Sequence, residues 1–166
     1  MPGVVVELQG TPPLTATSGS DGQYVAGGVP DGAWRIAPRK TGDRRGGLSA
    51  LDAAYVLQAV AGTRTLTPEQ MLAGDVTGDG TLSALDATRI LQFVVGALPQ
   101  LPAAQLCGSD WLFVPAATAP GASLLLPAIG AGTCERGAIV LGGLTSDAAG
   151  QDFQAVLIGD VSGNWR

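Results

Sequence analysis

Alternate positions of residues 75–80 (DVTGDG) carry oxygen-bearing side chains, and a glycine stands at the sixth position. Calcium prefers about six to eight oxygen ligands, and a short loop aims alternate side chains at one ion only where glycine permits a sharp turn. The spacing therefore predicts a calcium-binding loop. Its expected ligands combine loop side chains, a backbone carbonyl, a water-mediated contact and a carboxylate from the next helix: Asp75, Thr77, Asp79, Thr81, Ser83 and Asp86.

An internal repeat predicts a weaker site upstream. Residues 82–87 (LSALDA) are identical to residues 48–53, and such identity is rarely accidental. Arg45 at the fifth position of the upstream loop would repel a cation, and Ser-Ala-Leu-Asp is also a helix capping box that needs no metal, so both interpretations of this copy stay open. The candidate ligands of the upstream loop are Thr41, Asp43, Gly47 and Asp52.

A third copy of the loop sequence is only half present. Residues 159–164 (GDVSGN) repeat the opening of residues 74–79 (GDVTGD) and stop before any helix. One hypothesis is that this half-loop completes a metal site with another segment, such as the deficient first loop; the alternative is a simple β-turn after a strand ending at Ile158. Its candidate ligands are Asp160, Ser162 and Asn164.

Helices must position these loops. Apolar residues at helical spacing predict helices over residues 51–60 and 85–94, each ending near a glycine. Residues 67–70 (TPEQ) predict a further helix start, with threonine as N-cap and proline at the first helical position. Pro99 and Pro102 are expected to close the helical region.

Short strand-like runs separated by glycine and proline occupy both flanks of the chain. The predicted strands cover residues 4–8, 21–25, 30–36, 111–114, 124–126, 138–141 and 153–158. Neither flank alone has enough strands for a sandwich, so we predict an α+β fold in which residues 1–39 and 103–166 form one antiparallel β-sandwich around a helical insert, residues 40–102. Trp34 and Phe153 are expected in a common core.

The duplicated loop and helix, with Asp at position twelve of the loop, resembles the dockerin family over about residues 40–101. The resemblance implies two EF-hand-like halves related by a pseudo-twofold axis, bound calcium, and helices that dock onto a cohesin-type partner. It assigns partner choice to the residues before position twelve, and the two copies there are nearly equivalent: Ala50, Leu51, Ala84 and Leu85. The β flanks resemble the prealbumin-like sandwiches of CnaB and carboxypeptidase-regulatory type.

Composition argues against several functions. The formal net charge is -5 and basic residues are scattered, which disfavours nucleic acid and anionic membrane surfaces as partners. The sequence contains no histidine, so it cannot form a Ser-His-Asp or Cys-His arrangement, and we expect a protein that is not an enzyme.

Cys107 and Cys134 stand without a Cys-x-x-Cys motif or a histidine, so zinc is disfavoured. In an extracellular chain they would pair as a disulfide; the alternative is two buried thiols in a cytosolic protein.

The expected role is a secreted, calcium-binding interaction module. One alternative is a structural subunit of a surface assembly or filament that accepts a strand from its neighbour. Another is a carbohydrate-binding module with a sugar platform made by Trp34, Trp111 and Trp165, although such residues are more often core.

Overall fold

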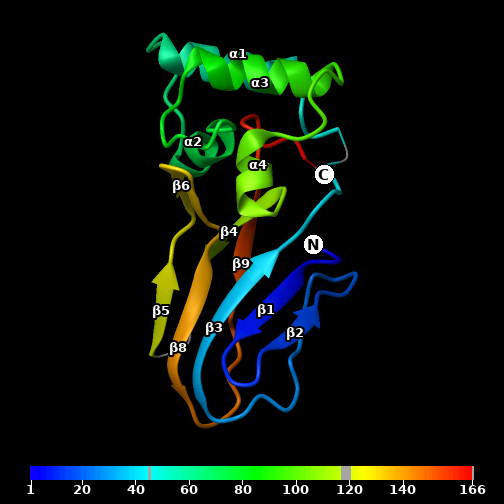
Figure 1. Cartoon of the computed structure of the whole chain (residues 1–166), viewed down its shortest axis with the longest axis vertical. Coiled ribbons are helices and arrows are strands. Elements are labelled where there is room, and N and C mark those ends of the chain that lie inside the picture. Colours follow the sequence, from blue (N-terminus) through cyan, green and yellow to red (C-terminus); the bar gives the residue numbers. More distant parts are fainter. Residues whose placement is uncertain (45, 117–120, 166) are drawn as a thin grey trace. The chain divides into compact units, whose positions relative to one another are not determined.

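The computed structural model describes residues 1–44, 46–116 and 121–165 (Figure 1). The chain divides into two compact units, each assembled from three segments. The first contains Met1–Lys40, Leu112–Pro127 and Glu135–Ala155, and the second contains Thr41–Trp111, Ala128–Cys134 and Val156–Arg166. The described residues form antiparallel sheets and four helices, so the predicted α+β class is confirmed.

A five-stranded antiparallel sheet forms the first unit. Its order is β2 (Leu14–Thr17), β1 (Val5–Gln9), β3 (Gly32–Arg39), β8 (Ala138–Leu144) and β5 (Ala122–Leu125). The central pairing of β3 with β8 joins the two ends of the sequence, with Trp34 opposite Leu141 (Figure 1). Strands from both flanks therefore share one sheet. Two further pairs are β4 (Trp111–Pro115) with β9 (Phe153–Leu157), and β6 (Ala128–Gly130) with β7 (Thr133–Glu135).

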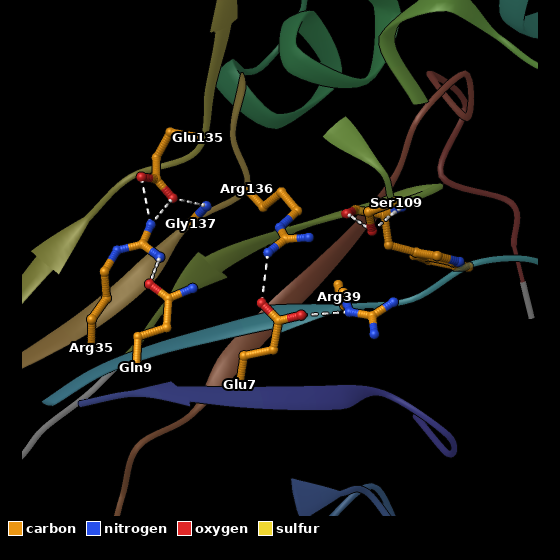
Figure 2. A network of polar contacts seen from close by, with 9 residues as sticks. Glu7, Gln9, Arg35, Arg39, Ser109, Glu135, Arg136 and Gly137 are labelled. Carbon is orange, nitrogen blue, oxygen red and sulfur yellow. Dashed lines mark hydrogen bonds and ion pairs between the residues drawn. The ribbon is translucent and has the colours of Figure 1, made fainter. Parts of the chain in front are cut away.

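Alternation along the strands gives this sheet one apolar and one charged face. Along β3, Trp34 and Ile36 are buried, whereas Arg35 turns to the other face. There Arg35 pairs with Glu135 at 2.6 Å. Beside this pair, Glu7 accepts hydrogen bonds from both Arg39 and Arg136, and Figure 2 shows both sets of contacts.

The apolar face of the sheet lines a cavity of about 1040 Å³ within the first unit. Trp34 and Phe153 both border it, and Phe153 makes an edge contact with Phe113 at a centroid distance of 6.5 Å. The two residues expected in a common core thus share the wall of a cavity.

The strand predicted over residues 21–25 is wrong, and β2 lies earlier in the chain. Turns explain the difference, because Asp21 accepts a hydrogen bond from Gln23 N–H at 3.0 Å and Gly19 N–H donates to the carbonyl of Gln23. The Tyr24 hydroxyl then donates to the carbonyl of Gln151 at 2.6 Å. Burial, assisted by the charge of Asp152, raises the pKa of Tyr24 to about 12.

The helices lie in the second unit and follow the predicted pattern closely. They are α1 (Ala50–Val60), α2 (Pro68–Gly74), α3 (Ala84–Val94) and α4 (Pro102–Cys107). α1 and α3 pack side by side (Figure 1), and the buried apolar residues of the two helices are small or branched: Ala53, Val56, Ala87 and Ile90. α2 starts with Thr67 as the expected N-cap, and the structure adds a capping box between Thr67 and Gln70.

The position of α4 differs from the prediction that the helical region closes at Pro99 and Pro102. Pro102 begins this helix and does not close the helical region, because a proline at the first helical position lacks an N–H that would go unused there. The helix ends at Gly108, whose φ of 59° is in the left-handed region.

The predicted disulfide between Cys107 and Cys134 is present, with the Cα atoms 5.2 Å apart. It ties the end of α4 to β7. On the chain-entropy model, closing a loop of 27 residues stabilises the fold by about 3.5 kcal/mol. In the described ranges, no helix has the length and apolar character needed to cross a membrane.

Candidate metal centre

Asp75 organises the second loop from its first position. Its Oδ1 accepts a hydrogen bond from Gly78 N–H at 2.9 Å, and its Oδ2 accepts one from Gly80 N–H at 2.8 Å. Gly80 has a φ of 88°, which a side chain would disfavour. The loop therefore curls around the Asp75 carboxylate as the sequence spacing predicts.

Asp86 closes the loop from the first turn of α3. Its Oδ2 accepts hydrogen bonds from the backbone N–H and the hydroxyl of Ser83, both at 2.9 Å, which completes a capping box. Its Oδ1 accepts from the backbone N–H and the hydroxyl of Thr77, at 2.9 and 2.8 Å. The buried Asp86 carboxylate thus caps α3 through Oδ2 and binds the loop through Oδ1. One side chain is therefore both the helix cap and the residue that closes the loop.

Three carboxylates influence one another in this loop. Burial raises the pKa of Asp75, and the charges of Asp86 and Asp79 raise it further, against the hydrogen bonds from Gly80 and Gly78 that lower it. Hydrogen bonds from Thr81 lower the pKa of the exposed Asp79. The neighbouring negative charges disfavour the ionised form of Asp75, and a bound cation would relieve that repulsion.

The donor chemistry of the loop fits calcium, which accepts carboxylate, hydroxyl and peptide oxygens together. In the part of the chain that the structure describes, no group of three or more His, Cys, Asp or Glu side chains forms a preassembled cage. The hydroxyls of two residues named as ligands bond within the loop: Thr81 donates to Asp79 at 2.7 Å, which leaves its backbone carbonyl as the expected ligand atom, and Ser83 donates to Asp86.

The β6–β7 hairpin lies against the second loop. A Cβ added at Gly78 would lie 3.2 Å from Cγ2 of Ile129, and one added at Gly80 would lie 3.4 Å from Cα of Gly130. The glycines therefore serve close packing as well as the turn, and the disulfide holds this hairpin to α4. The sequence does not predict this contact directly, and its one signal is the pair of loop glycines, Gly78 and Gly80.

Asp52 repeats the role of Asp86 in the first copy. It is fully buried, and its Oδ2 accepts from the N–H and the hydroxyl of Ser49 at 2.7 and 2.9 Å in a second capping box. Its Oδ1 accepts from the backbone N–H of Ser162 at 2.8 Å, across a sequence separation of 110 residues. The structure thus brings the C-terminal half-loop to the first helix.

The half-loop itself is built around Asp160. Oδ1 of Asp160 accepts from Gly163 N–H at 2.8 Å and from Asn164 N–H at 3.1 Å, and Oδ2 accepts from Trp165 N–H at 3.0 Å. The Ser162 hydroxyl donates to the same carboxylate at 3.2 Å. A turn does follow β9, since Asp160 N–H donates to the carbonyl of Leu157, and the loop continues beyond it.

The upstream segment around residues 41–47 contacts tryptophans. The carbonyls of Gly42 and Asp43 accept from the indole N–H groups of Trp111 and Trp165, at 3.0 and 2.8 Å. Gly47 packs closely against Trp165, because a Cβ added at Gly47 would lie only 3.1 Å from Cβ of Trp165. Thr41 is exposed, and Arg45 lies outside the described residues.

The proposed sugar platform does not assemble as an exposed surface. Trp34 and Trp111 are buried, as the core interpretation predicts. Trp165 is half-buried and makes an edge contact with Trp111 at a centroid distance of 4.8 Å.

The residues assigned to partner choice lie on the outer surface of the helices. Leu51 and Leu85 are 47% and 49% exposed. Ala50 and Ala84 beside them are exposed as well.

Comparison with known families agrees with this geometry. Residues 44–94 match the model of the dockerin type I domain, which supports a dockerin domain in this part of the chain. No match was found among curated proteins. The same holds for solved structures.

Proposed function

We propose that the helical unit is a calcium-stabilised dockerin-type module that docks onto a cohesin-type partner through the outer faces of α1 and α3. The family match over residues 44–94 and the loop around Asp75 and Asp86 support calcium binding and an interaction role. We propose further that the chain has no catalytic function and lies outside the cell, where its disulfide is stable.

One observation carries the docking proposal. Large apolar side chains stay exposed at equivalent positions of both helices, although the opposite faces of the same helices are well buried. Exposed apolar clusters of this kind are typical of protein interaction sites. The matched pairs are Leu51 with Leu85, Leu57 with Leu91, and Val60 with Val94.

Because the two faces are nearly equivalent, either one alone should support docking. We expect Leu51→Asp or Leu85→Asp singly to change affinity for a cohesin domain by no more than about twofold. The double variant should weaken it by about 100-fold or more, since a buried charge would then oppose both binding modes. Biolayer interferometry against a panel of recombinant type I cohesin domains, in calcium, measures this.

Val25→Asp is the matched control, because Val25 is a strongly exposed apolar residue outside the helices. Its affinity should equal that of the unmodified chain. A double variant that binds as tightly as the control would show that these faces do not contact the partner.

A further inference from the structure

We propose that the module holds a second calcium ion in a split site, made by Asp52 at the start of α1 and by the C-terminal half-loop, residues 160–164. The inference rests on the proposed calcium-binding function and adds a site that no single stretch of sequence encodes. The segment between residues 41 and 47, which precedes α1 in sequence, is not part of it.

Several backbone contacts of the half-loop match those of the second loop. Ser162 N–H reaches Oδ1 of Asp52 at 2.8 Å, as Thr77 N–H reaches Oδ1 of Asp86 at 2.9 Å. The carboxylate at position one likewise accepts from the N–H at position four in both loops, at 2.8 Å for Asp160. Equal geometry built from matching sequence predicts the same ligand.

Charge supplies an independent argument. Asp52 and Asp160 are both buried, at 0% and 8% exposure. Among the described residues, the ion pairs are Arg35–Glu135, Arg39–Glu7, Arg44–Asp110 and Arg136–Glu7, and none includes either carboxylate. Buried carboxylates are normally paired with a cation or bound to a metal. A calcium ion between the two segments would balance this charge.

The half-loop is anchored well enough to act as one side of a site. The backbone carbonyl of Val161 accepts from the side chain of Gln70 on α2 at 2.9 Å, and Gly159 N–H donates to the carbonyl of Ala73 at 2.8 Å. Val161 is fully buried, as Val76 is in the second loop. Trp165 closes the segment through its indole bond to Asp43.

The number of carboxylates also predicts which of the two sites binds calcium more tightly. The second loop offers the carboxylates of Asp75, Asp79 and Asp86, whereas the split site has Asn164 where the second loop has Asp79. Fewer anionic ligands lower calcium affinity, so the split site should be the weaker one.

The test counts calcium ions bound to the full chain by native mass spectrometry and follows affinity by calorimetric titration. We expect two ions on the unmodified chain, with affinities at least about tenfold apart. Asp160→Asn should remove the weaker ion, and Asp75→Asn the tighter one. Asp147→Asn changes an exposed carboxylate in the other unit and should leave both ions in place.

The double variant Ser162→Ala with Asn164→Ala provides a second test in case the Asp160 variant does not fold. It should lower the calcium affinity of the split site by about tenfold. Two ions that survive Asp160→Asn, with one lost in Asp43→Asn, would place the second ion in the upstream loop and overturn the split site. One ion on the unmodified chain, lost only with Asp75→Asn, would overturn the split site and leave the proposed function standing. No bound ion at all would overturn both.

Discussion

Withdrawal of calcium is expected to unfold the helical unit at a much lower temperature. At a calcium concentration about 100-fold above the dissociation constant, one site contributes about 2.7 kcal/mol to the free energy of unfolding. For a unit of this size, that energy corresponds to a shift of roughly 10–20 °C in the melting temperature. The shift arises because Asp75, Asp79 and Asp86 repel one another once no cation lies between them.

Circular dichroism of the helices during heating, in calcium and in EGTA, measures this shift. Asp75→Asn supplies the control, since a chain without the tighter site keeps only the weaker proposed ion and should show a clearly smaller difference in melting temperature between the two buffers. An unmodified chain whose melting temperature is the same in calcium and EGTA would contradict the role given to the loop.

Asp86→Ala should be among the most destabilising single substitutions in the chain. The buried Asp86 carboxylate accepts four hydrogen bonds from two residues, Thr77 and Ser83. Its removal leaves those donors unpaired and deletes a helix cap, at a cost of about 3–5 kcal/mol. Asp52→Ala should cost a similar amount if the half-loop contact at Ser162 is equivalent.

Urea unfolding in EGTA isolates this structural cost from metal binding. Asp79→Ala is the matched control, because Asp79 is exposed and, among the described residues, its side chain bonds within the loop to Thr81 and Thr77. It should change the free energy of unfolding by no more than about 0.5 kcal/mol in EGTA. Equal losses of unfolding free energy for Asp86→Ala and Asp79→Ala would show that the hydrogen bonds of Asp86 to Ser83 and Thr77 contribute little to stability.

Local features of the helical unit could be predicted from the sequence because each is encoded within a few residues. The capping boxes at Ser49, Thr67 and Ser83, and the loop around Asp75, all depend on side chains close to the backbone that they bind. The start of α4 at Pro102 is not predictable from the sequence alone, because a proline fits both after a helix and at the start of the next one.

Features that join distant segments were only partly predictable. The repeated GDV sequence led to the hypothesis that the half-loop completes another site, but nothing local indicated the anchors Gln70 and Asp43. Too few strands in each flank suggested the shared sheet, which the β3–β8 pairing realises. The cavity beside Trp34 was not foreseen, because packing of side chains against a sheet face depends on shapes that a sequence pattern does not carry.

The proposed requirement for docking is that calcium holds α1 and α3 in the form that binds a partner. It is tested most directly by measuring the affinity of one cohesin domain for the unmodified chain in calcium, in EGTA, and after calcium is restored. We expect binding in calcium, a loss of affinity of at least about 100-fold in EGTA, and full recovery when calcium is restored. Binding of equal affinity in EGTA would contradict it.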